Sequence, residues 1–152
     1  MAESSDLISL YSKRILALAS DVPHTDRLDA PDATAMKRSP LCGSTVTVDV
    51  VVKRGKVSDF GQDVKACALG QASAAILGAQ AIGATRAEIG EARDALLAML
   101  KQGSAPPGGK FAALEVLAPA KDYKNRHASI LLAYDALVEA MDQAMEKAAI
   151  RV

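Results

Sequence analysis

Residues 45–53 read TVTVDVVVK, and this stretch decides the fold class. Val46, Val48, Val50 and Val52 occupy every second position of this stretch. The residues between them are Thr45, Thr47, Asp49 and Val51, of which the first three are polar. Successive side chains of a strand point to opposite faces, so the alternation predicts a strand with one buried face. Arg54 and Gly55 then predict a tight turn, after which residues 56–63 return as an antiparallel strand.

Helical patterns flank this hairpin on both sides. Apolar residues recur at helical spacing over residues 6–20 and again from Cys67 until Gly83 breaks the pattern. Thr85 and Glu88 form a capping box, which opens a second helix to about residue 101. We predict a short helix over residues 111–117, ended before Pro119, and a last helix over residues 126–147.

Two segments lack such patterns. Residues 21–40 contain three prolines and many polar residues, which indicates an irregular connector. Residues 103–109 form a loop that is too short to link two domains. Strands cluster early and helices late, so a parallel sheet with crossover helices is not expected. We therefore predict one α+β domain over residues 1–152: an N-terminal helix, a small antiparallel sheet, and a helical half packed on the sheet.

The charge balance and the hydropathy exclude several classes of protein. Eighteen basic and eighteen acidic residues cancel, so the chain lacks the excess of positive charge expected of a nucleic-acid-binding protein. No apolar run is long enough to cross a membrane. The first residues, MAESSDL, carry acidic side chains where a signal peptide needs positive charge. We therefore expect a cytoplasmic protein, in which cysteines are thiols or metal ligands rather than a disulfide.

The chain holds two cysteines, and the hairpin predicts that they lie near each other. Cys42 precedes the valine strand, Cys67 follows the returning strand, and each is about twelve residues from the turn. Cys67 also lies at the start of a helix, where free backbone N–H groups favour a thiolate. A thiolate is the form that binds metal or accepts sulfur. The alternative is that both cysteines pack as small hydrophobic side chains, and no CxxC motif decides between these interpretations.

Other candidate residues carry weaker signals. His127 begins the last helix and is a possible extra ligand, although histidines at such positions mostly lie at the surface or cap a helix. Three serines, Ser44, Ser73 and Ser129, have no visible base partner, and no GxSxG motif is present. A serine hydrolase is therefore not supported, and we do not expect an enzyme.

Three segments resemble the NifU N-terminal, IscU and SufU family of iron–sulfur cluster scaffold proteins. Residues 39–44, SPLCGS, followed by the alternating strand, resemble the first cysteine segment of the family. Residues 67–74, CALGQASA, resemble the second segment, and residues 126–137, RHASILLAYDAL, look like the third. The resemblance covers nearly the whole chain, with spacings closest to the SufU type and a pattern closest to α-proteobacterial NifU-like proteins.

The chain departs from the family pattern at three positions of the site. The third cysteine of the family falls on Ser129, the aspartate after the first cysteine falls on Ser44, and the glycine before the second cysteine falls on Ala66. The chaperone-binding LPPVK segment of IscU is also missing. Cys42 and Cys67 are therefore the expected metal ligands, because a neutral hydroxyl binds iron or zinc poorly beside a thiolate.

The resemblance implies a scaffold that receives sulfur from a cysteine desulfurase, binds iron, and passes a transient iron–sulfur cluster to apo-protein acceptors. Zinc can occupy such a site in place of iron. A [2Fe–2S] cluster needs four ligands, so two thiolates of one chain do not suffice. Three hypotheses follow. In the first, a homodimer shares the cluster, or one chain recruits His127 as an extra ligand. In the second, the thiols carry persulfide and no cluster is stored, and in the third the protein is a binding module whose cysteines lie in the core.

Overall fold

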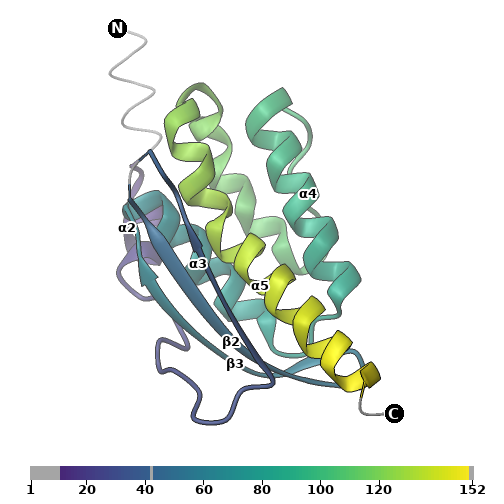
Figure 1. The fold of residues 1–152 in the computed structure, drawn as a ribbon. Helices are drawn as coiled ribbons and strands as arrows, with labels where there is room; N and C mark the ends of the chain where they lie inside the picture. The colour runs from purple at the N-terminus through teal and green to yellow at the C-terminus, as the bar shows by residue number, and fades with distance from the viewer. Residues whose placement is uncertain (1–10, 42, 151–152) are drawn as a thin grey trace, which may run out of the picture.

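The computed structural model describes residues 11–41 and 43–150. Eight elements follow one another along this part of the chain: α2 (Lys13–Ala19), β1 (Ala33–Arg38), β2 (Thr45–Lys53), β3 (Lys56–Lys65), α3 (Ala68–Ala81), α4 (Arg86–Gln102), the 3-10 helix η1 (Gly109–Asp122) and α5 (Lys124–Ile150). The sheet forms one layer and the later helices pack on it, with α5 running along the sheet beside β1 (Figure 1). The predicted α+β class is confirmed.

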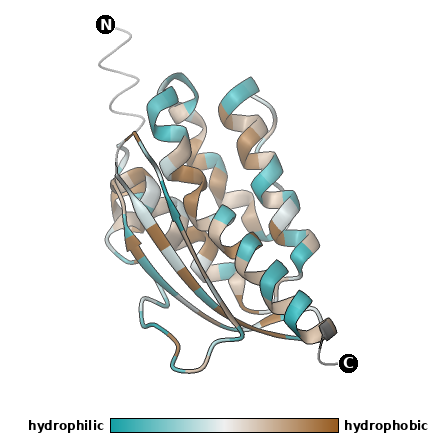
Figure 2. Ribbon diagram, viewed as in Figure 1, coloured by the Kyte–Doolittle hydropathy of each residue, from teal (hydrophilic) through white to brown (hydrophobic). Residues whose placement is uncertain are grey.

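The valine strand lies at the centre of a three-stranded antiparallel sheet with the order β1-β2-β3. Its predicted bounds match β2, and β3 runs two residues further than predicted. Arg54 and Gly55 both have positive φ, at 55° and 75°, as a tight hairpin turn requires. Val46, Val48 and Val50 are fully buried on the face that α5 covers. The buried apolar residues of the helices and strands form one shared core. Hydrophobic stretches of the ribbon, such as those in the centre of the sheet, are brown in Figure 2.

The prediction of an irregular connector over residues 21–40 is wrong in its last third, where β1 forms. This strand reads ATAMKR and holds one β-branched residue, so its own sequence gives little strand signal. It forms because β2 offers a free edge, and Ala35 pairs with Val48 across that edge. Pairing with a strong neighbouring strand therefore determines this element, and no local pattern reveals it.

Asp49 fixes the remaining connector to the sheet. Its carboxylate is fully buried and accepts hydrogen bonds from the Arg27 guanidinium, the Leu28 N–H and the Thr34 hydroxyl. Burial opposes the charge of Asp49, but these hydrogen bonds outweigh burial and hold its pKa below the ordinary value. The connector also closes over Gly61, where an added Cβ would lie 2.4 Å from the carbonyl oxygen of Asp26.

The helices agree with the predictions except at the first helix and around Pro119. The first helix, α2, begins at Lys13 with Ser12 as its N-cap, so residues 11 and 12 are not helical as predicted, and residues 6–10 lie outside the described residues. The capping box of Thr85 and Glu88 is present at the start of α4. The predicted short helix is instead the 3-10 segment η1, which is kinked at Phe111 and continues through Pro119. The last helix, α5, extends beyond residues 126–147 at both ends. Among the described residues, no helix combines the length and apolar character needed to span a bilayer.

Candidate functional site

Cys67 lies at the N-terminus of α3, as the sequence predicts. It is the N-cap residue, with extended backbone angles and no capping hydrogen bond from its side chain. Its carbonyl oxygen accepts the first helical bond from the Gln71 N–H at 2.9 Å. The thiol is free and half-buried, so it is held by the fold and still open to solvent. Such a position suits a ligand or nucleophile better than a core residue.

Two serines from distant parts of the chain converge on this thiol. The Ser129 hydroxyl lies 3.5 Å from the Cys67 sulfur and donates a hydrogen bond of 3.1 Å to the Ser44 hydroxyl. Ser129 comes from α5 and Ser44 from the residue before β2, and both are buried. The structure thus brings together the second and third cysteine positions and the aspartate position of the expected family pattern.

Small residues in α3 permit this close approach of the two helices. A Cβ added to Gly70 would lie 2.7 Å from the Ser129 hydroxyl oxygen and 2.8 Å from the Ala66 Cβ. One turn further along α3, the Ser73 hydroxyl donates to the Ile130 carbonyl of α5 at 2.7 Å. The sequence patterns did not identify Gly70 as a residue of this site. The lack of a side chain within a run of small helical residues is the signal that could have indicated it.

Cys42, the other predicted ligand, lies outside the described residues. The turn on either side of it is described and closed by two backbone bonds of 2.8 Å, from Ser39 N–H to the Ser44 oxygen and from Gly43 N–H to the Ser39 oxygen. At the same end of the hairpin Thr45 pairs with Lys65, two residues before Cys67. The proximity of the two thiols remains a prediction that follows from this pairing.

His127, the predicted extra ligand, is buried rather than at the surface. Its Nε2 lies 2.8 Å from the Ala120 carbonyl oxygen and 3.1 Å from the Lys121 carbonyl oxygen. These bonds tie the end of η1 to the start of α5 and engage one ring nitrogen. The Nδ1 atom is buried and has no hydrogen-bond partner within the part of the chain that the structure describes. His127 therefore has a structural role that the sequence did not reveal, and only Nδ1 is free for a metal.

The donor set around Cys67 is poor in metal ligands. Across residues 11–41 and 43–150, no three His, Cys, Asp or Glu side chains lie close enough together to hold a metal ion. The neutral hydroxyls of Ser44 and Ser129 stand where charged ligands would strengthen binding. Within the described part of the chain, Cys67 is therefore the one thiol at this site, and Cys42 stays a predicted ligand.

Comparisons with known proteins identify structures with the same fold. No protein-family model and no curated protein matches the chain. A crystal structure of a nitrogen-fixing NifU-like protein (N-terminal) from Brucella abortus matches with a TM-score of 0.91 and 46% identity, covering 93% of this chain and 99% of that one. A putative iron–sulfur cluster assembly scaffold protein for the SUF system from Fervidobacterium islandicum matches with a TM-score of 0.80 and 22% identity, covering 88% of this chain and 98% of that one. A hypothetical protein matches with a TM-score of 0.78 and 23% identity, covering 89% of this chain and 98% of that one.

The two weaker matches show a shared fold. The similarity to the Brucella protein shows more, because 46% of the residues are identical over nearly the whole chain. The chain belongs to the NifU N-terminal and SufU-like family of iron–sulfur cluster assembly scaffold proteins. This confirms the resemblance found in the sequence. The family is one of scaffolds, which are generally not catalysts.

Proposed function

We propose that this protein is a cytoplasmic scaffold that binds iron and a transient iron–sulfur cluster through Cys42 and Cys67, within one domain over residues 1–152. The observation that carries the proposal is the position of Cys67: a free, half-buried thiol at the N-terminus of α3. The Ser129 hydroxyl adjoins it and bonds in turn to the Ser44 hydroxyl, and both serines lie at other ligand positions of the family. Sulfur comes from a cysteine desulfurase, and the cluster passes to apo-protein acceptors.

The number of thiols determines how a cluster is held. A [2Fe–2S] cluster takes four protein ligands, and the chain has two cysteines. Two copies of the chain, each supplying Cys42 and Cys67, complete the set of ligands. We favour this homodimer over recruitment of His127, because the Nε2 of His127 already contacts two backbone carbonyls. Zinc or iron alone can occupy the same thiolates when no cluster is present.

The serines favour a second function, in which the thiols carry sulfur and no cluster is stored. Ser129 gives the Cys67 sulfur a hydrogen-bonding neighbour, and Ser44 bonds to Ser129, without either serine adding a strong metal ligand. In this function the Cys67 thiolate attacks the outer sulfur of a protein persulfide. A sulfur–sulfur bond forms on Cys67, the donor's sulfur–sulfur bond breaks, and the donor leaves as a thiolate that takes up one proton. No net oxidation or reduction occurs in this exchange.

Anaerobic reconstitution with ferrous iron and sulfide separates the two functions. The scaffold function predicts visible charge-transfer absorption, about two iron atoms per two chains, and loss of both signals in Cys42→Ala and in Cys67→Ala. Size-exclusion chromatography of the reconstituted protein should show a dimer. Ser73→Ala is the matched control, because it removes a buried hydrogen bond between the same helices without touching Cys67.

The sulfur-carrier function predicts a different result in the same samples. Incubation with a cysteine desulfurase and cysteine should add one sulfur atom to Cys67 or Cys42, detected by mass spectrometry, while no iron is retained. Zinc content should be measured in parallel. If the wild type binds no metal, accepts no sulfur and resists a small alkylating reagent at both thiols, both functions are excluded and a binding module with core cysteines remains.

A further inference from the structure

The strand β1 leaves one edge of the sheet open. Among residues 11–41 and 43–150, the order β1-β2-β3 gives β1 a neighbouring strand on one side only. In an antiparallel pair, alternate residues direct their backbone N–H and C=O groups to the partner strand. The Ser39 N–H bonds to the Ser44 oxygen, and Ser39 continues the register of β1. The backbone groups of Thr34, Met36 and Arg38, at the alternate positions, therefore point away from β2. These three residues are exposed, so the edge is open to a further strand.

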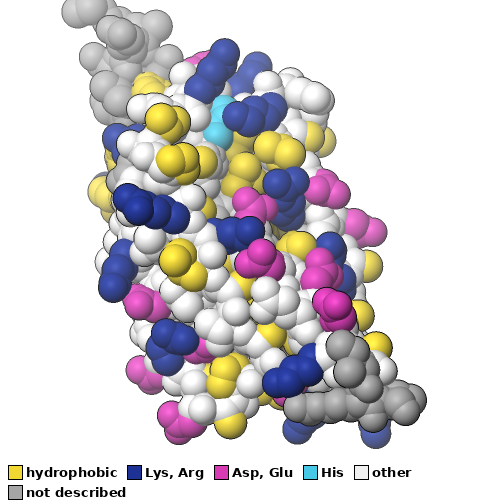
Figure 3. Space-filling view, viewed as in Figure 1, with side chains coloured by type: hydrophobic (Ala, Val, Ile, Leu, Met, Phe, Trp, Pro, Cys, Tyr) yellow, Lys and Arg dark blue, Asp and Glu magenta, His cyan; other side chains and the backbone are white. Residues whose placement is uncertain are grey.

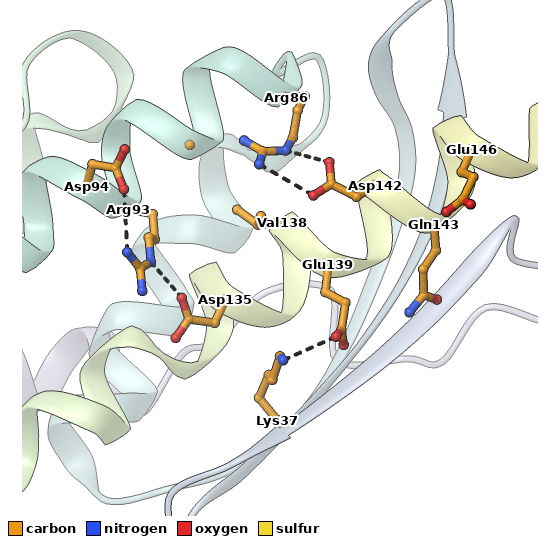
Figure 4. A pocket seen from close by; sticks show the side chains of 11 residues that line it. Lys37, Arg86, Arg93, Asp94, Asp135, Val138, Glu139, Asp142, Gln143 and Glu146 are labelled. Atoms are coloured by element: carbon orange, nitrogen blue, oxygen red, sulfur yellow. Dashed lines mark hydrogen bonds and ion pairs between the residues drawn. The ribbon is translucent and has the colours of Figure 1, made fainter. Parts of the chain in front are cut away.

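A trough with a volume of about 740 Å³ lies beside this edge, with α5 as its floor and β1 and α4 as its walls. We name it the α5 trough. Lys37 of β1 reaches into it from the strand, while Arg86 and Arg93 reach in from α4 (Figure 4). Figure 3 shows the same face with its intermixed basic and acidic side chains over α5. The trough is separate from the thiol site, because neither Cys67 nor either serine of that site lines it.

Acidic side chains outnumber basic ones in the α5 trough, by five to three. Each base pairs with an acid of α5: Lys37 with Glu139 at 3.2 Å, Arg86 with Asp142 at 2.8 Å and Arg93 with Asp135 at 2.7 Å. Glu146 also lines the trough, is exposed, and has no ion pair within the described part of the chain. Asp94 shares Arg93 with Asp135, so the trough has two more acidic than basic side chains, and the protein itself does not neutralise this excess of negative charge.

We propose that the β1 edge and the α5 trough together bind an extended segment of a partner protein in which every second residue is Lys or Arg. The segment adds to β1 as a fourth strand, with its backbone bonded to the free edge. Since side chains alternate along a strand, one set of alternate side chains lies over α5. Basic residues in that set meet the acidic floor. Charge complementarity selects this occupant over an acidic segment.

The dimensions of the two elements fit such a segment. The six residues of β1 span roughly 20 Å at the rise of a strand. The eleven-residue interval from Asp135 to Glu146 spans roughly 17 Å at the rise of a helix. The two elements pack against each other and run side by side (Figure 1). A single extended segment of six to eight residues (about 20–27 Å) can therefore contact both along their length.

Binding is tested on the full ¹⁵N-labelled chain by NMR titration with an eight-residue peptide that alternates Lys and Thr. The expected result is saturable movement of the backbone signals of residues 34–38 and 135–146, with affinity falling as salt rises. A peptide that alternates Glu and Thr, and the Lys peptide with N-methyl groups at alternate backbone nitrogens, should not bind. Glu146→Lys should weaken binding about fivefold. Glu115→Lys makes the same charge change at an exposed site outside the trough and should leave the affinity unchanged.

Met36→Pro tests the strand edge separately from the charge. It removes an N–H that points away from β2, so the sheet is retained while the segment loses a hydrogen bond. Weaker binding in this variant, with an unchanged unfolding midpoint, supports the proposal. Several outcomes overturn it: no binding, binding that the N-methyl peptide reproduces, signals that move elsewhere, or a free protein that ultracentrifugation shows to be a dimer paired through β1.

Discussion

The Ser129 hydroxyl lies 3.5 Å from the Cys67 sulfur although the two residues are 62 positions apart in the chain. α3 and α5 therefore meet at the thiol, and the residue at position 129 determines how many sulfur ligands one chain can offer. With serine there, the chain has two cysteines in all. This relationship explains why we assign cluster binding to a pair of chains.

Ser129→Cys should add a third thiolate beside Cys67 and raise the affinity for zinc by at least about tenfold, because thiolate is a stronger zinc ligand than a hydroxyl. Zinc binding measured by competition with a chromophoric chelator checks this. Ser73→Cys is the control, since it places a thiol in the same helix pair where the native hydroxyl bonds to Ile130 and not to Cys67. An equal gain in both variants would contradict the assignment of position 129 to the site.

Gly70→Ala should lower the free energy of unfolding by about 1–3 kcal/mol, because the added Cβ would lie 2.7 Å from the Ser129 hydroxyl oxygen. Urea unfolding checks the change in stability. Gly90→Ala is the matched control: its added Cβ meets the end of the flexible Arg86 side chain, which can move aside. A helical alanine is favoured over glycine, so this control should be neutral or stabilising.

Asp49→Asn should lower the free energy of unfolding by about 1–3 kcal/mol at neutral pH, because it weakens the hydrogen bonds from Arg27, Leu28 and Thr34. In the wild type the folded-state pKa of Asp49 is lowered. Its contribution is therefore fully present above the unfolded value of about 3.9 and is lost as the pH falls through the folded-state pKa.

Urea unfolding of the wild type and of Asp49→Asn between pH 2 and pH 7 tests this dependence. The difference in stability between the two proteins should shrink as the pH falls below about 4. Asp63→Asn is the control on the adjacent strand, where the carboxylate is partly exposed and its ion pair with Lys65 is 3.9 Å long. A difference that stays constant with pH would show that Asp49 acts by packing and not by charge.

His127→Ala should lower the free energy of unfolding by about 1–3 kcal/mol, because it removes a buried side chain and its Nε2 hydrogen bond to the Ala120 carbonyl, which then keeps the Tyr123 N–H as its donor. The amount of zinc bound per chain should not change. Thermal unfolding and zinc analysis of the same sample check both expectations. A loss of bound zinc at unchanged stability would instead identify Nδ1 of His127 as a ligand.

Local patterns predicted the elements whose residues carry their own signal. The alternation of residues 45–53 predicted β2 with its correct bounds, and the capping box of Thr85 and Glu88 predicted the start of α4. The prediction of β1 failed because its pairing with β2, and not its composition, forms it. The prediction at η1 failed because Pro119 was taken to end a helix, whereas the 3-10 helix continues through it.

The candidate site was predictable in part. The family resemblance pointed to Ser44, Cys67 and Ser129 together, and the structure brings these three side chains into contact. The burial of His127 was not predictable, because its partners Ala120 and Lys121 are backbone carbonyls that carry no mark in the sequence. The α5 trough could not be predicted from the sequence either, because its ion pairs join residues of α4, α5 and β1 that lie far apart along the chain.

By itself the sequence determined the α+β class, the hairpin, the helical half and the number of thiols, because periodicity and composition are local properties of the chain. The tertiary structure alone decided that Ser129 adjoins Cys67, that β1 forms an open sheet edge, and that an acidic trough lies beside it. Those features depend on how helices and strands far apart in the chain pack together. Local spacing does not encode that packing.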